Sequence, residues 1–140
     1  TKDTDTIRSE NPDIEFLEKL IFEEINNYRA SKGLDSLVWS SALANKCKSH
    51  CNWMNRIKKP THSYNHMGEC VFGGGHAFGI ETYRFHAIGY AQEWIESPPH
   101  RDILLSEHKY TGGVGVKVED NSYNGIFITF QTGLRQTPLK

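Results

Sequence analysis

Apolar residues recur at steps of three and four positions in three stretches of the chain, and this spacing predicts three amphipathic helices. The first helix begins at Asn11-Pro12, where a capping residue precedes a first-turn proline, and it ends at Gly33. The second helix is capped by Ser40 or Ser41. The side chains predicted to face inward are Ile14, Leu17, Ile21, Ile25 and Tyr28 in the first helix, Leu43, Cys47, Cys51 and Met54 in the second, and Phe85, Ile88, Ala91 and Ile95 in the third, which covers residues 81–96.

The pattern changes after the third helix. Ser97-Pro98-Pro99 stops that helix, and Ser97 also caps a short helical turn that runs to Leu105. Alternating residues then predict two strands, 113–118 and 126–130, which form a hairpin. Helices first and strands mostly last indicate an α+β fold rather than a βαβ repeat.

Residues 61–79 follow neither period and are predicted to form a loop. This segment contains three consecutive glycines, Gly73, Gly74 and Gly75. Because glycine restricts the backbone so little, we expect the segment to be mobile unless another part of the protein orders it.

The composition fits one globular domain. At 140 residues, the chain is long enough for one buried core and short for two. We expect residues 1–12 to form a polar tether and residues 13–140 to form the domain. A net charge of -1, with no basic patch, argues against a nucleic-acid partner. No apolar run reaches the roughly 18 residues that a membrane span requires. Since the chain begins at Thr1, we interpret it as a mature or trimmed form, and the tether as a route to a lipidated N-terminus.

Three cysteines leave the disulfide state open. Cys47 and Cys51 lie one helical turn apart, a spacing that favours two parallel buried thiols over a relaxed disulfide. A bridge from Cys70 to one of them would imply an oxidising compartment. The sequence has no CxxC pair, which argues against a structural zinc site.

Histidines on either side of the third helix provide the main candidate chemistry. His62 and Glu69 lie in the predicted loop, and His100 follows the two prolines. Imidazole nitrogens and a carboxylate can bind zinc or a similar divalent ion when they converge, but no HExxH signature is present. Ser63 and Ser97 lie close to histidines without a GxSxG elbow or an orienting Asp, so a serine nucleophile is disfavoured. The cysteines are disfavoured too, because two lie on an apolar helical face and the third follows Glu69.

The order of several short motifs resembles that of the CAP superfamily, which comprises cysteine-rich secretory, antigen 5 and pathogenesis-related-1 proteins. The motifs are Asn26-Asn27-Tyr28-Arg29, Lys32-Gly33-Leu34, Leu37-Val38-Trp39, His62-Ser63 with Gly68-Glu69, Trp94-Ile95-Glu96-Ser97-Pro98-Pro99-His100-Arg101, and Gly113-Val114-Gly115-Val116. The segment around His100 is similar to the WMNSPGHRxNIL segment of bacterial SCP-like members. The resemblance extends from about residue 14 to residue 133.

This resemblance implies a three-layer α-β-α sandwich with a small, mainly antiparallel central sheet, in a protein that is exported. The family has a cleft tetrad of two histidines and two acids. His62, Glu69 and His100 match three of these residues, whereas Ser97 stands where the second acid would fall, as in bacterial relatives. The resemblance also implies that His62 and His100 can hold a divalent metal such as zinc, and that His66 is only part of the loop.

Three functions remain open, in this order of preference. The first is a non-enzymatic extracellular or cell-surface module, including an outer-membrane-anchored lipoprotein. Such a module would bind a sterol, a fatty acid, or a host or cell-surface protein through the CAP cleft. The second is a purely structural polar cluster. The third is a metal-dependent hydrolase in which His62 and His100 hold the metal and Glu69 activates water.

Overall fold

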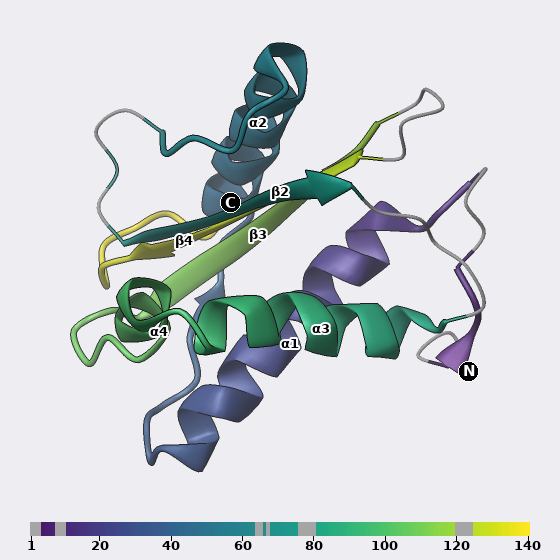
Figure 1. The fold of residues 1–140 in the computed structure, drawn as a ribbon. Coiled ribbons are helices and arrows are strands. Elements are labelled where there is room, and N and C mark those ends of the chain that lie inside the picture. Colours follow the sequence, from purple (N-terminus) through teal and green to yellow (C-terminus); the bar gives the residue numbers. More distant parts are fainter. Residues whose placement is uncertain (1–3, 8–10, 64–65, 67, 76–80, 120–124) are drawn as a thin grey trace.

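The computed structural model describes residues 4–7, 11–63, 66, 68–75, 81–119 and 125–140. Within these residues, four helices surround a four-stranded sheet (Figure 1). The helices are α1 (Ile14–Ser31), α2 (Ser41–Ile57), α3 (Tyr83–Ile95) and α4 (Pro98–Leu104). The strands are β1 (Val38–Trp39), β2 (Glu69–Gly75), β3 (Thr111–Val118) and β4 (Gly125–Gly133). Their order in the sheet is β1-β3-β4-β2, with β1 parallel to β3 and the other pairs antiparallel, which confirms the predicted α+β class.

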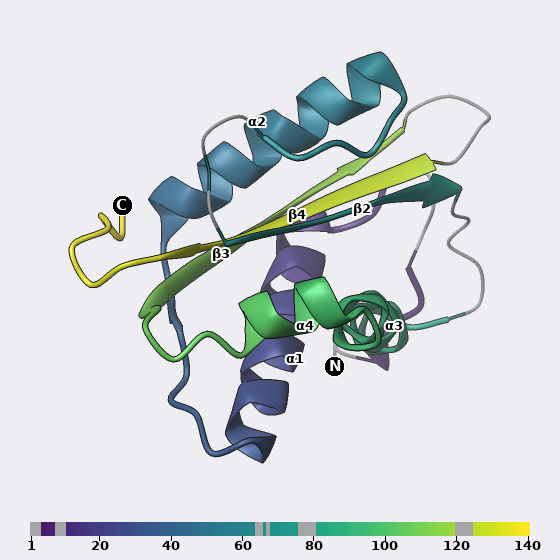
Figure 2. The ribbon, with the colours of Figure 1, turned by 60° about the vertical axis from the view of Figure 1, so that its left-hand side comes forward.

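The helices lie in two layers, one on each face of the sheet. Figure 2 shows α2 on one side, and α1, α3 and α4 on the other. The main core forms between the sheet and the layer of α1 and α3. This arrangement is the three-layer α-β-α sandwich that the resemblance implied.

Strand β3 shows how the sequence sets this layering. Side chains alternate between the two faces of a strand, so Val114 and Val116 face the main core, where both are fully buried. Gly113 and Gly115 face α2, and a Cβ added to either would lie 2.4–2.5 Å from the α2 backbone. The alternation of glycine and valine therefore allows α2 to rest directly on the sheet.

Helix α3 is present as predicted, and its predicted inward face is right for Ala91, which is buried, and for Ile95, which packs against the main core, but wrong for the other two residues. Phe85 and Ile88 are 60% and 47% exposed, whereas Trp94 and Ala87 are buried in the core. Most of the helix surface is apolar, so the pattern favoured no single face. The helix is instead rotated about its axis so that its ring-bearing residues Tyr83, His86, Tyr90 and Trp94 are buried.

The prediction of a loop over residues 61–79 is wrong for its central part. Residues 69–75 form β2, which pairs with β4 from Glu69↔Gln131 to Gly75↔Gly125. The predicted mobile glycines thus belong to a strand, because β4 offers a complete set of backbone partners that does not depend on side chains. The parts of the predicted loop at 64–65, 67 and 76–79 lie outside the described residues.

The N-terminal segment departs from the predictions in two ways. Asp13, rather than Asn11, caps α1, and its side chain accepts a hydrogen bond from the amide of Phe16 at 3.1 Å. Ile7 is buried in the main core, and its amide donates to the carbonyl of Glu81 at 3.3 Å. The expectation that residues 1–12 are only a tether is therefore wrong for Ile7.

All three cysteines are buried as free thiols, which confirms the preferred interpretation for Cys47 and Cys51 and leaves no bridge from Cys70. Cys47 and Cys51 are residues of α2 that face the sheet, and their thiols donate to the carbonyls of Gly113 and Gly115 in β3. Cys70 lies in the main core on the opposite face. The sheet itself separates Cys70 from the other two.

Candidate functional site

The two predicted histidines lie side by side. His62 comes from the segment between α2 and β2, and His100 is the third residue of α4. Their ring centroids are 6.3 Å apart. The His62 side chain is 59% exposed, and His100 is half-buried. His62 and His100, which are 38 positions apart in the chain, meet because β2 is an edge strand. The segment that contains His62 and the helix α4 both pass beside the first residues of β2.

Glu69, the first residue of β2, is held by four hydrogen bonds. Its Oε1 accepts from the Nδ1 of His62 at 3.0 Å and from the amide of Ser63 at 2.8 Å. Its Oε2 accepts from the hydroxyl of Ser63 at 2.5 Å and from the Nε2 of Gln131 at 2.7 Å. A carboxylate has about four lone-pair sites, so all of its acceptor capacity is in use.

This environment keeps Glu69 ionised. Burial alone would raise the pKa of this carboxyl, whose side chain is 1% exposed, but the bonds from Ser63, Gln131 and His62 together lower it. A base with a lowered pKa and no unoccupied lone pair is poorly suited to take a proton from water. The geometry makes Glu69 a positioning residue for His62.

The bond to Glu69 also fixes the chemistry of the His62 ring. With Nδ1–H donating to the carboxylate, the lone pair of the neutral ring lies on Nε2. Burial, and then the proximity of His62, lower the pKa of His100, which favours the neutral form of the His100 ring. Neutral imidazoles are the nitrogen ligands that divalent zinc prefers, so these two rings suit such an ion. Within the described part of the chain, no cluster of three His, Cys, Asp or Glu residues is placed to hold a metal, so the remaining ligands would come from water or a partner.

The other residues considered from the sequence have different positions. Ser97 occupies the N-cap of α4, but its side chain makes no capping hydrogen bond. Glu96, the residue before Ser97, is exposed and accepts a hydrogen bond from the Nε2 of Gln92 at 3.1 Å. His66 bonds the carbonyl of Thr132 through Nε2 at 3.2 Å, which ties its segment to β4.

Gln131 is a site residue that the sequence analysis missed. It lies on β4 directly opposite Glu69 and is buried. Its Nε2 holds the carboxylate, while its Oε1 is buried without a hydrogen-bond partner among the described residues. The available signal was that Gln131 directly follows the predicted strand 126–130 and continues its alternation.

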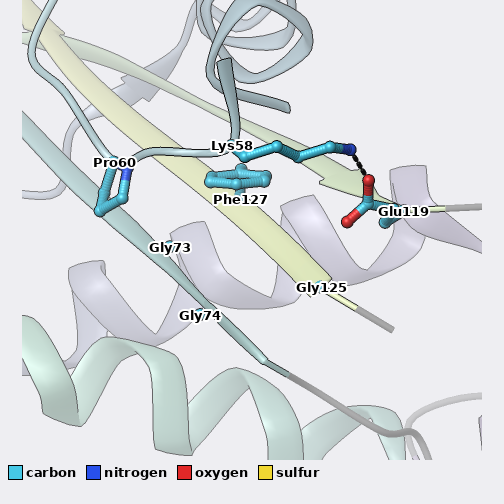
Figure 3. A pocket seen from close by; sticks show the side chains of 7 residues that line it. All are labelled: Lys58, Pro60, Gly73, Gly74, Glu119, Gly125 and Phe127. Atoms are coloured by element: carbon cyan, nitrogen blue, oxygen red, sulfur yellow. Dashed lines mark ion pairs between the residues drawn. The ribbon is translucent and has the colours of Figure 1, made fainter. Parts of the chain in front are cut away.

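A separate cavity lies on the same face of the sheet, toward the other end of β2 (Figure 3). Its volume is about 490 Å³. Figure 3 shows the ring of Phe127 beneath the stem of Lys58, whose Nζ forms an ion pair with Glu119. The lining residues are Lys58, Pro60, Gly73, Gly74, Glu119, Gly125 and Phe127.

Fold and site together define a small α-β-α sandwich with two adjacent imidazoles and one buried carboxylate. The model of the CAP family, described as the cysteine-rich secretory protein family, matches residues 22–132. The chain belongs to this family.

Solved structures show the same fold at low sequence identity. An outer surface protein of Borrelia burgdorferi has a TM-score of 0.63 and 16% identity, over 88% of this chain and 96% of that one. An extracellular protein of Bacillus anthracis that contains an SCP domain has a TM-score of 0.58 and 21% identity, over 84% of this chain and 40% of that one. A hookworm platelet inhibitor has a TM-score of 0.58 and 14% identity, over 97% of this chain and 78% of that one. No match was found among curated proteins.

Proposed function

We propose that this chain is an exported or cell-surface CAP module without enzymatic activity, and that it binds an elongated apolar ligand, a fatty acid or a sterol, in the cavity beside Phe127. The observation that carries this proposal is the cavity itself, whose mostly apolar walls include a single ion pair. Its volume falls in the range of small-molecule sites. No described helix has the length and hydropathy that a membrane crossing needs.

The lining suits a ligand with one polar end. The ring of Phe127, the ring of Pro60 and the side-chain-free strand at Gly73 and Gly74 offer apolar contacts. An ammonium group has three donors, so Lys58 can bind a ligand carboxylate while it keeps Glu119. A sterol hydroxyl could instead accept from Lys58 and donate to Glu119.

The sequence pointed to a ligand at the cleft of His62 and His100, whereas we assign the ligand to the cavity. For the histidines we propose a divalent metal site, with zinc held by His62 and His100 and the first of these oriented by Glu69. A bound zinc ion would supply Lewis acidity. Hydrolysis would still need a base, and the four donors around Glu69 argue against that role.

Ligand binding is tested by titrating the protein with the fluorescent fatty acid cis-parinaric acid and, separately, with cholesterol. We expect saturable binding of at least one. Lys58→Gln should weaken fatty-acid binding about tenfold, the effect of losing about 1.4 kcal/mol of charge-assisted bonding. The exposed neighbour provides the matched control, since Lys59→Gln should bind like the parent protein. If neither cis-parinaric acid nor cholesterol binds saturably, the proposal is refuted.

The metal site is tested by thermal unfolding with and without zinc. Zinc at 100 times its dissociation constant should add about 2.7 kcal/mol of stability. His62→Ala and His100→Ala should each abolish this gain, whereas His108→Ala, at an exposed histidine, should retain it. A gain that survives both site substitutions would place zinc elsewhere.

A further inference from the structure

A second concave surface lies on α3, away from the histidines and from the Phe127 cavity. It has a volume of about 320 Å³. It is formed by α3, by Glu81 just before that helix, and by Phe72 of β2. Figure 1 shows α3 and β2 next to each other along this side of the molecule. We call it the α3 groove, and its lining residues are Phe72, Glu81, Phe85, His86, Gly89, Tyr90 and Glu93.

Four rings form a continuous row in the α3 groove, and two of them, Phe85 and Phe72, reach solvent, whereas His86 and Tyr90 are buried. The centroid of Phe85 lies 5.6 Å from that of His86, which lies 6.2 Å from that of Tyr90. Tyr90 in turn lies 5.6 Å from Phe72. Phe85 is 60% exposed, and a large exposed aromatic side chain beside a groove is a common mark of a binding surface.

Gly89 keeps the α3 groove open. It lies four residues after Phe85 and four before Glu93, on the same side of the helix. A Cβ added at Gly89 would meet no atom within 4 Å, so packing does not require a glycine there. Glycine is also the poorest helix former after proline. Gly89 thus weakens the helix, and it leaves space between the ring of Phe85 and the carboxylate of Glu93.

The charge around the rings is negative. Glu81 and Glu93 both line the α3 groove, and the Oε2 of Glu81 lies 3.9 Å from the Nε2 of His86. Arg84, the cation on the same helix, is held by Glu23 and Glu24 of α1 at 3.2 and 2.7 Å. Ring faces and carboxylates both attract cations, so the complementary ligand carries positive charge.

We propose that the α3 groove binds an arginine side chain of a partner polypeptide. A guanidinium is planar, so it can stack on an aromatic ring while its edge pairs with a carboxylate. A lysine ammonium can also lie over a ring, but as a point charge it has no planar edge to pair with a carboxylate while its face stacks. This proposal does not depend on the ligand of the Phe127 cavity or on zinc.

The test is an NMR titration of the ¹⁵N-labelled protein with N-acetyl-arginine amide. The neutral isostere N-acetyl-citrulline amide is the matched control ligand. We expect saturable shift changes at the amides of residues 85–90 with the arginine compound, and about tenfold weaker binding of the citrulline compound. Glu93→Gln should weaken arginine binding several-fold, whereas Glu107→Gln, at an exposed carboxylate elsewhere, should leave it unchanged.

A second pair of variants separates groove filling from misfolding. Gly89→Leu places a side chain in the α3 groove and should abolish the shifts, and Gly89→Ala should raise the melting temperature while retaining weaker binding. Equal binding of citrulline, shifts centred outside residues 85–90, or unchanged binding in a folded Gly89→Leu protein would overturn the proposal. Tighter binding of tetramethylammonium than of the arginine compound would overturn the assignment to a guanidinium.

Discussion

Replacing Glu69 by methionine keeps the length of the side chain but removes the acceptor that holds four donors together. Two of those bonds come from Ser63, one from His62 and one from Gln131. A second variant, Glu69→Gln, keeps one acceptor and adds two donors. Comparing the two variants separates the loss of the charge from the loss of all acceptors.

The cost of Glu69→Met can be worked from the surroundings of each donor. The amide of Gln131 is buried, and leaving its Nε2 without a partner costs about 1–3 kcal/mol. The three other donors are at a partly exposed site and can bond water instead, so each loses only about 0.5 kcal/mol. We expect a total loss of about 3 kcal/mol, a large share of the roughly 5–15 kcal/mol that stabilises a typical domain.

Glu69→Gln should cost less, about 1 kcal/mol. Its amide oxygen can keep the bonds from the Nδ1 of His62 and the amide of Ser63. Its NH₂ group can donate to Gln131 if the Gln131 amide turns over. The turn replaces a clash between two NH₂ groups by a hydrogen bond to Oε1, but it moves Nε2 to a position without a partner among the described residues, and this loss is the source of the expected cost.

The pH dependence follows from the lowered pKa of Glu69. The ordinary value is 4.5, and the folded-state pKa lies below it. The ionised carboxylate therefore stabilises the fold fully above about pH 5, and this contribution is lost as the pH falls through the folded-state pKa. The difference in stability between the parent protein and Glu69→Met should be constant from pH 7 to about pH 5 and shrink below that.

Urea unfolding followed by tryptophan fluorescence measures these differences, with a chelator present so that metal binding does not contribute. Exposed Glu107→Gln is the control for a simple change of charge and should alter stability by less than about 0.5 kcal/mol. A cost below about 1 kcal/mol for Glu69→Met, or a difference that does not shrink at low pH, would refute the view that Glu69 organises the site.

Three further predictions concern the scaffold. Arg29 is buried and donates to the carbonyls of Asp35, Leu104 and Ser106, so Arg29→Met should cost about 3–4 kcal/mol in urea unfolding, while exposed Arg56→Met costs almost nothing. Gly115→Ala should cost more than about 2 kcal/mol, since its Cβ would meet the α2 backbone at 2.4 Å; an unchanged melting temperature would contradict the direct contact of α2 and β3. Thiol titration should give three free thiols only after denaturation, and a reducing agent should not change the melting temperature.

Much of the fold could be predicted from local patterns. The spacing of apolar residues located α1 and α2 and their inward faces, because each helix has one clear apolar side. The same spacing failed for Phe85 and Ile88 of α3, because apolar residues occur all round that helix. Strand β2 was missed because its glycines look like a loop, and its pairing with β4 depends on backbone groups that a side-chain pattern does not report. Parallel β1 has two residues and no pattern of its own.

The site could be predicted only in part. The resemblance to CAP proteins identified His62, Glu69 and His100, and the structure places the two rings together with Glu69 bonded to one of them. The donors that saturate Glu69 could not be predicted, since Gln131 reaches it through the pairing of β2 with β4. Sequence motifs thus identified the candidate residues, while the pairing of β2 with β4 determined the hydrogen-bond donors around Glu69.

The serine at position 97 shows why this distinction matters for function. The resemblance to CAP proteins implied a second acid, or in bacterial members its loss, at this position, and the hydroxyl found there makes no capping bond to α4. Its identity is therefore not explained by the local needs of the helix. At Glu69, the four donors leave a carboxylate that orients His62 rather than one that is open to a proton. The proposal that the two histidines hold a divalent metal rests on this orientation, because a carboxylate that holds Nδ1 leaves Nε2 of the same ring for a ligand bond.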